Sequence, residues 1–426
     1  MNIISEAVKA MTGYNIHIVK TDKYKTNTIV WKMKAPLKKE EATLRALLPY
    51  VLQSSSKEFP TTGKLRSYLD ELYGASLYVD LAKKGEFHII SFSLEIANEK
   101  FLSDPTPLLK KAIEFLAGLL MKPNTDGSVF HKETVANEKR TLKQRIQSVY
   151  DDKMRYSNYR LIQEMCKDEP YSLHVHGDMD AVDTITAETL YDYYQIALKQ
   201  DELDLYIIGD VNEDEVIEVV SEQLQFSERL PKIIDSSNYV SKNNVNEVIE
   251  EQDVKQGKLN IGYRTNIKYG DEDYYALQVF NGVFGGFSHS KLFLNVREKA
   301  SLAYYVTSRL ESHKGLMMVM SGIDNKNYDQ AIQIINEQMD AMKRGDFTEE
   351  EMEQTKAVIK NQLLETIDTS RGMVEILYHN VVSKKDISLD EWMQKMDCVT
   401  KDDIVAVANK VKIDTVYFLT GKGDAK

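Results

Sequence analysis

An internal repeat constrains the fold of this chain more than any other feature of its sequence. Two strand-like segments that turn at Lys84-Gly85 have a counterpart that turns at Lys314-Gly315, and a helical pattern follows each pair. The other matches keep this order: amphipathic helices at 107–121 and 328–343, charged helices at 130–149 and 347–367, and closing strands at 204–210 and 415–422. Matched segments in one order, about 200 residues apart, indicate duplication of a whole domain.

The duplication predicts two domains and a connecting segment. We expect an N-terminal domain at 1–228, a polar linker at 229–250 and a C-terminal domain at 251–426. Each half reads as strand, helix, strands, helices, helix and strand. This order predicts an α+β fold of two homologous domains, each a mostly antiparallel sheet with helices packed on one face.

Charge and composition exclude several classes of protein. The net charge is −12, which argues against nucleic-acid binding, because neutralising phosphates requires an excess of positive charge. No run of about 18 apolar residues is present, so we expect no membrane span. The first residues lack the apolar core of a secretory signal. Cys166 and Cys398 are too few and too distant for a disulfide framework, and we expect both to be buried. These features predict a soluble, cytoplasmic protein.

One segment of the second half carries a recognisable pattern. Its residues are Asn281, Gly285-Gly286, Ser288, Ser290, Leu292-Phe293, Arg297-Glu298-Lys299 and Leu302-Ala303-Tyr304. This run resembles the second-domain signature of the pitrilysin/insulinase family of zinc metallopeptidases, which includes mitochondrial processing peptidase. The duplicated architecture extends the resemblance over nearly the whole chain. The resemblance implies half of a peptidase clamshell that encloses a peptide-binding chamber.

The resemblance also identifies a metal site that this sequence has lost. Active members carry His-x-x-Glu-His on the first helix of the first domain, and a later glutamate completes the zinc site. Positions i and i+4 share one helical face, so both imidazoles can bind one ion. Here the matching positions read Pro49-Tyr50-Val51-Leu52-Gln53, and Ala136 stands where the third ligand is expected. We therefore expect no catalytic zinc in this chain, with Pro49, Leu52, Gln53 and Ala136 as the degenerate motif positions.

Other candidate sites are weaker. His174 and His176 form a short His-x-His near Asp168, Glu169 and Asp178, but a pair without a clear third ligand is a weak metal signal. The sequence contains no G-x-S-x-G elbow, Walker A loop or dinucleotide fingerprint. We expect the glycines of NGVFGGFSHS to end a helix in a tight turn rather than to bind phosphate.

Arg297 and Tyr304 keep a chemical role open. They match an arginine and a tyrosine that, in active relatives, reach across the chamber to the substrate backbone and the developing oxyanion. Both are donors that do not titrate near neutral pH. The alternative is that Arg297 pairs with a local carboxylate and Tyr304 packs at the start of a strand.

The resemblance implies a division of labour between two chains. Some family members pair a zinc-bearing subunit with one that lacks zinc, and this sequence most resembles the motif-lacking member of a bacterial pair. We expect a non-catalytic subunit of a heterodimeric zinc peptidase that helps to bind peptide or an unfolded segment and offers Arg297 and Tyr304 to its partner. Alone, it could form a homodimer. The alternatives are a peptide-binding or scaffolding protein without a role in proteolysis, and an autonomous hydrolase with relocated metal ligands.

Lysines cluster near the N-terminus of this acidic chain. They are Lys20, Lys23, Lys25, Lys32, Lys34, Lys38 and Lys39. We expect a solvated strand face and turn. The alternative is a docking surface for an acidic partner or peptide, and a bound peptide would extend an exposed sheet edge.

Overall fold

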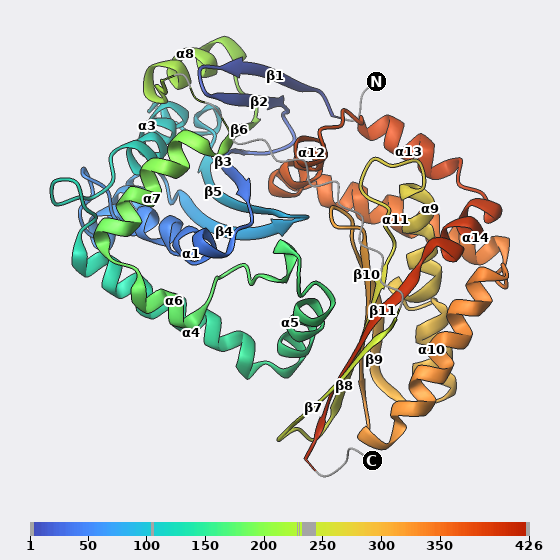
Figure 1. The fold of residues 1–426 in the computed structure, drawn as a ribbon. Helices are drawn as coiled ribbons and strands as arrows, with labels where there is room; N and C mark the ends of the chain where they lie inside the picture. The colour runs from blue at the N-terminus through green and yellow to red at the C-terminus, as the bar shows by residue number, and fades with distance from the viewer. Residues whose placement is uncertain (1–3, 104–105, 228, 230, 232–243, 423–426) are drawn as a thin grey trace.

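The computed structural model describes residues 4–103, 106–227, 229, 231 and 244–422 (Figure 1). Its first sheet has the strand order β1-β2-β6-β3-β5-β4. The strands are β1 (Glu6–Met11), β2 (Tyr14–Lys20), β3 (Thr26–Pro36), β4 (Ser76–Lys84), β5 (Phe87–Ala97) and β6 (Glu202–Gly209). The β2–β6 pair is parallel and the other neighbouring pairs are antiparallel.

Helices of the first half contribute to a shared hydrophobic core with one face of this sheet. They include α1 (Lys39–Ser54), α2 (Thr62–Glu71), α3 (Leu108–Met121), α4 (Lys132–Asp151), α6 (Met179–Thr184), α7 (Ala187–Gln200) and α8 (Glu213–Gln223). Trp31 and Phe92 are fully buried at the centre of this core. The amphipathic pattern predicted at 107–121 is helix α3, which places eight buried residues toward the core.

The second sheet repeats the plan, with the order β7-β11-β8-β10-β9. Its strands are β7 (Asn246–Gln252), β8 (Gly257–Arg264), β9 (Ala303–Glu311), β10 (Leu316–Ile323) and β11 (Lys412–Gly421). The β7–β11 pair is parallel and the other neighbouring pairs are antiparallel. Helices on one face are α9 (Tyr274–Asn281), α10 (Tyr328–Lys343), α11 (Glu349–Ile367), α13 (Leu389–Asp397) and α14 (Lys401–Lys410). The predicted fold of two sheet-and-helix units is confirmed.

The segment between the sheets overlaps the predicted linker at 229–250. Residues 232–243 lie outside the described part of the chain, and the last residues of the predicted range, from Asn246 onward, already belong to β7. The domain limits themselves stay a prediction.

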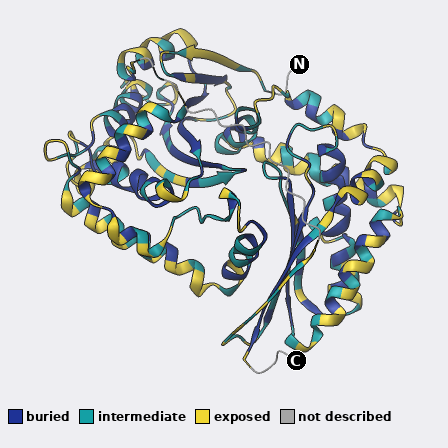
Figure 2. Cartoon of the chain, viewed as in Figure 1, coloured by how far each residue is buried: buried dark blue, intermediate teal, exposed yellow. Residues whose placement is uncertain are grey.

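Each half also covers the second face of the other half's sheet, which the sequence did not predict. Helix α5 (Lys153–Met165) belongs to the first half but packs on β8 and β11, where Leu161 and Met165 share one hydrophobic cluster with Met318 and Tyr417 of the second half. Helix α12 (Ser370–Ser383) belongs to the second half but packs on β3 and β6, where Tyr378 contacts Tyr206. Figure 1 shows both helices between the two halves, and Figure 2 shows that the central strands beside them are largely buried.

The α12 contact corrects the prediction for the lysine cluster. Lys32 and Lys34 are 2% and 1% exposed, so they are not on a solvated strand face. Lys32 Nζ lies 2.6 Å from Glu375 Oε1 on α12, and Lys34 Nζ lies 2.9 Å from Glu202 Oε2. Lys84 also pairs with Glu375, at 3.1 Å. The acidic partner of Lys32 is therefore Glu375, in the C-terminal half of the same chain. Lys20, Lys23, Lys25 and Lys39 are exposed, as expected, and Lys38 is half-buried.

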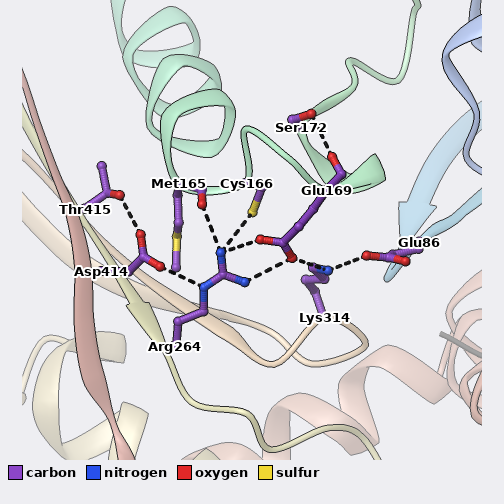
Figure 3. A network of polar contacts seen from close by, with 9 residues as sticks. All are labelled: Glu86, Met165, Cys166, Glu169, Ser172, Arg264, Lys314, Asp414 and Thr415. Carbon is purple, nitrogen blue, oxygen red and sulfur yellow. Dashed lines mark hydrogen bonds and ion pairs between the residues drawn. The ribbon is translucent and has the colours of Figure 1, made fainter. Parts of the chain in front are cut away.

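A second polar network connects the halves beside α5 (Figure 3). Arg264 of β8 donates to Asp414 Oδ2 at 2.9 Å and to Glu169 Oε2 at 3.1 Å. Lys314 lies 2.6 Å from Glu169 and also contacts Glu86, in the turn between β4 and β5. Burial alone would raise the pKa of Glu169, but the hydrogen bonds from Arg264 and Lys314 hold it below its usual value.

The two cysteines differ from each other. Cys166 is buried and its thiol pKa is raised to about 12, chiefly by burial. Cys398 is exposed, so the prediction that both thiols are buried is wrong for this residue.

The Figure 3 network makes a stability prediction. Glu169→Gln leaves Arg264 and Lys314 without one negative charge at a buried position, so we expect a loss of about 2–4 kcal/mol in the free energy of unfolding. Urea unfolding measures this loss. Asp168→Asn, which alters the exposed neighbour, is the control and is expected to change stability by less than about 0.5 kcal/mol. Equal stability of the two variants would contradict a central role for Glu169.

His17 makes a pH prediction. Its ring lies 2.8 Å from Glu6 Oε1 and 3.2 Å from Asp204 Oδ1. Burial lowers its pKa, but hydrogen bonds to Asp204 and Glu6 outweigh burial and raise the pKa to about 9. Because the folded pKa is raised, the stabilisation is complete below the unfolded value of about 6.5 and is lost as the pH rises through about 9.

We therefore expect His17→Gln to be less stable than the native chain by up to about 3 kcal/mol at pH 6, with the difference shrinking above about pH 9. Urea midpoints of both proteins across this range measure it. A difference that stays constant with pH would show that His17 is not charged in the folded protein.

Candidate functional site

Helix α1 carries the positions of the degenerate motif and is anchored by a buried arginine. Arg45 donates from Nη1 to Asp201 Oδ2 at 2.6 Å, from Nη2 to the Met33 carbonyl at 2.6 Å and from Nε to the His88 carbonyl at 3.2 Å. These bonds fix α1 against β3 and β5. One turn further along, Pro49 lies inside the helix, where it lacks the N–H that would bond to the Arg45 carbonyl.

The remaining motif positions have structural contacts. Leu52 is 1% exposed and belongs to the hydrophobic core, and Pro49 is buried. Gln53 is half-buried, and its amide Nε2 donates to the Leu77 carbonyl of β4 at 3.1 Å. These side chains connect α1 to its surroundings instead of presenting metal ligands.

The expected third-ligand position does not face α1. Ala136 is exposed on α4, whereas Glu138, Thr141 and Arg145 of the same helix line a cavity with Tyr50 and Gln53. Glu138, Thr141 and Arg145 follow the i, i+3, i+7 spacing of one helical face, and Ala136 lies off that face. Ala136 therefore lies outside this cavity, and its place as the third-ligand position stays a prediction. Arg145 is a cavity residue that the sequence reading did not name, and its helical spacing from Glu138 could have indicated it.

This α1–α4 cavity has a volume of about 350 Å³. Its walls come from α1, α2, β4 and α4, and include Tyr50, Gln53, Arg66, Leu77, Glu138 and Arg145. The guanidinium carbon of Arg145 lies 3.4 Å from the centroid of the Tyr50 ring. Its Nη1 atom is buried and has no hydrogen-bond partner among the described residues. Burial raises the pKa of Glu138, and the nearby Arg145 partly opposes this.

The donors in this cavity do not suit zinc. Zinc sites in proteins use thiolates, imidazoles and carboxylates, with about three protein ligands in catalytic sites. The cavity offers one carboxylate, one amide already bonded to β4, and two arginines whose permanent positive charges oppose a cation. Across the described ranges, no group of three or more His, Cys, Asp or Glu residues is arranged to hold a metal ion.

In the His-x-His pair, the first histidine makes a local hydrogen bond. His174 Nδ1 accepts the backbone N–H of His176 at 3.2 Å, and burial lowers the pKa of His174 to about 3. The nearby Asp178 caps α6 by accepting the N–H groups of Asp180 and Ala181. Glu169 belongs to the network of Figure 3.

Arg297 and Tyr304 are both open to solvent. Arg297 lies in a π-helical segment, η4 (Phe293–Lys299), with its guanidinium 4.6 Å from the Phe293 ring centroid and its Nε 3.9 Å from Glu298 Oε1. Tyr304 is the second residue of β9, an edge strand, and is 65% exposed. Its hydroxyl lies 3.4 Å from Asp324 Oδ1. Tyr304 thus stands at the start of a strand with most of its side chain in solvent, and Arg297 has a local carboxylate at long range.

The glycines before this segment pack a helix against β9. After α9 the chain continues as a π-helical segment, η3 (Gly282–Gly286). A Cβ at Gly285 would lie 2.6 Å from Ser308 Oγ, so only glycine allows this approach. None of these glycines has the positive φ of a helix cap, so the predicted tight C-cap is replaced by the π-helical segment.

Comparison with known proteins agrees with the lack of metal ligands on α1. Residues 184–359 match the family model described as "Peptidase M16 inactive domain". The chain is 56% identical over 421 residues to "Probable inactive metalloprotease YmfF" of Bacillus subtilis, covering 99% of both chains. The chain belongs to the peptidase M16 family. This confirms the resemblance to the pitrilysin/insulinase metallopeptidases.

Two proteins of lower sequence identity are also similar to the chain. It is 23% identical to the mitochondrial-processing peptidase subunit beta of Saccharomyces cerevisiae over 323 residues, 71% of this chain and 68% of that one. A crystal structure of a conserved protein from Enterococcus faecalis V583 superposes with a TM-score of 0.91 at 36% identity, covering 99% of this chain and 100% of that one. Within the described residues of this M16 chain, no helix has the length and apolar character needed to cross a membrane.

The side chains around α1 make a metal prediction. We expect the purified chain, dialysed after incubation with zinc, to retain far less than one zinc ion per molecule, because the α1–α4 cavity holds two arginines and one carboxylate. Elemental analysis of the dialysed protein measures this. Stoichiometric zinc that disappears in the His174→Ala, His176→Ala double variant would contradict the assignment and would favour relocated ligands.

Proposed function

We propose that this chain is the non-catalytic subunit of a heterodimeric zinc peptidase. In this proposal a pitrilysin-like partner carries the zinc, and the present chain helps to bind the peptide and offers Arg297 and Tyr304 to the partner's active site. The observation that carries the proposal is the contrast between two sites in one chain. The motif positions on α1 have become core and packing residues, whereas Arg297 and Tyr304 remain at the surface.

The two exposed side chains suit the task of contacting a reacting peptide. The Arg297 guanidinium stacks on Phe293 and makes no hydrogen bond within the described residues, so its N–H groups are available to a substrate carbonyl. The Tyr304 hydroxyl can donate to the oxyanion that develops when water attacks that carbonyl. Neither group needs to change its charge near neutral pH.

Peptide binding is supported by the edges of the two sheets. Strand β4 is an edge of the first sheet and borders the α1–α4 cavity through Leu77, and β9 is the corresponding edge of the second sheet. An extended peptide can add to such an edge through main-chain hydrogen bonds, which give affinity with little sequence selectivity. A peptide or an unfolded segment of a protein is therefore the proposed substrate.

The proposal includes the setting in which the chain acts. The absence of a long apolar helix among the described residues, the negative net charge and the bacterial relative of 56% identity support a bacterial protein of the cytoplasm. We propose no cofactor and no nucleic-acid ligand for this chain, and self-association into a homodimer where the partner is absent.

A peptide-binding or scaffolding protein without a role in proteolysis is the second candidate. The stacking of Arg145 on Tyr50 supports it, because a cation beside the degenerate motif positions suits binding of an acidic group better than binding of a metal ion. The two candidates differ in what they expect of Arg297 and Tyr304.

The test uses the complex that co-purifies with the native protein. With the zinc-bearing partner present, we expect Arg297→Ala and Tyr304→Phe each to lower kcat/KM for peptide cleavage by about 100-fold, the usual loss when one oxyanion donor is removed. Arg344→Ala is the matched control, because Arg344 is an exposed arginine at the end of α10 that belongs to neither η4 nor β9, and we expect its activity to be unchanged.

Cleavage that is independent of Arg297 and Tyr304 would reject the contribution to the partner's site and would favour the scaffolding function. Cleavage by the isolated chain, without the partner, would contradict both candidates.

A further inference from the structure

We infer that the α1–α4 cavity is a carboxylate-binding site in which Arg145 is the cationic anchor. The ligand class is a peptide carboxylate, either the C-terminus of a peptide or the side chain of an aspartate or glutamate. This inference rests on the peptide-binding part of the proposed function, but it requires neither the partner subunit nor its zinc.

The position of Arg145 supports an anionic ligand. The guanidinium carbon lies over the Tyr50 ring, 3.4 Å from its centroid, and this contact with the ring face uses none of the guanidinium N–H groups as hydrogen-bond donors to an oxygen. Nη1 is nevertheless buried and lacks a hydrogen-bond partner in the described parts of the chain. A buried donor without a partner is costly, and a ligand that supplies an acceptor removes this cost.

The charges around the cavity also favour an anion. Arg145 Nη1 has no acceptor among the described residues, and Arg66 of α2 adds a second guanidinium to the cavity wall. Glu138 is the acidic group on the cavity wall, and burial raises its pKa. A bound carboxylate would therefore meet two arginines and one glutamate on the cavity wall.

The remaining wall suits a peptide rather than an inorganic anion. Leu65, Leu69 and Leu77 supply apolar surface, and Gln53, whose Nε2 is bonded to Leu77, keeps its amide oxygen as an acceptor for a peptide N–H. The volume of about 350 Å³ is at the small end of ligand sites, which suits one carboxylate with an adjoining side chain. The cavity borders edge strand β4, along which the rest of the peptide can lie.

The test measures binding of short peptides to the isolated, full-length chain by calorimetry. The first probe is an acetylated tetrapeptide of Ala and Leu with a free C-terminus, and it is compared with the same peptide amidated. The second pair consists of amidated peptides with a central Glu or a central Gln. We expect the wild-type chain to bind the carboxylate member of at least one pair about tenfold or more tightly, as a charge-assisted bond to arginine implies. The pair that shows the preference identifies the source of the carboxylate.

Variants assign this preference to the cavity. We expect Arg145→Gln to abolish the preference, and Arg140→Gln, an exposed arginine of the same helix, to retain it. Glu138→Gln is expected to tighten binding of the carboxylate peptide about two- to fivefold, because it removes a negative charge from the wall.

Equal affinity for both members of each pair in the wild-type chain would overturn the inference without any variant, so the result does not depend on whether Arg145→Gln folds. A preference that survives in a folded Arg145→Gln protein would also overturn it. Because no partner is present in this experiment, its failure would leave the Arg297 and Tyr304 assay of the proposed function unaffected.

Discussion

The structure depends on the exchange of one helix between the two halves. Each sheet is covered on one face by helices of its own half, and the other face is apolar, with Val30, Ile89 and Tyr206 in the first sheet and Met318 and Tyr417 in the second. Exposing such faces to water would be strongly unfavourable. Helix α12 covers the first and α5 covers the second, so neither half has a complete core without the other. This arrangement fixes how α1 and β9 lie relative to each other.

Charged groups at these contacts orient the helices. Glu375 on α12 lies between Lys32 and Lys84, and Glu169, just after α5, joins Arg264 to Lys314 (Figure 3). Burying charges is costly unless they are paired, so a shifted helix would leave lysine or arginine side chains unpaired. Each half thus places one glutamate between two basic residues of the other half. Within this rigid frame, the region of α1 and α4 carries a stacked arginine, and the surface of η4 and β9 keeps Arg297 and Tyr304 accessible.

Local patterns in the sequence predicted much of the fold. The helices expected at 107–121 and 328–343 are Leu108–Met121 and Tyr328–Lys343, and both hairpins turn where the Lys-Gly pairs stand. Contacts between distant segments were not predictable in this way. The local sequence predicts an exposed Lys32, because the helix that buries this side chain begins more than 300 residues later. The lack of the zinc motif could be read from the sequence, but Arg145 was not named from it, because the residues that α4 presents to α1 depend on how the two helices pack.

The chain is a member of the M16 family whose first half has the sheet-and-helix fold but lacks the zinc motif. We propose that its second half still serves catalysis, at another chain's metal. A structure of the chain in complex with its zinc-bearing partner and an uncleaved peptide tests this most directly. We expect the Arg297 guanidinium and the Tyr304 hydroxyl within hydrogen-bonding distance of the peptide carbonyl next to the partner's zinc. A complex in which both side chains remain in solvent, away from that carbonyl, would contradict the claim.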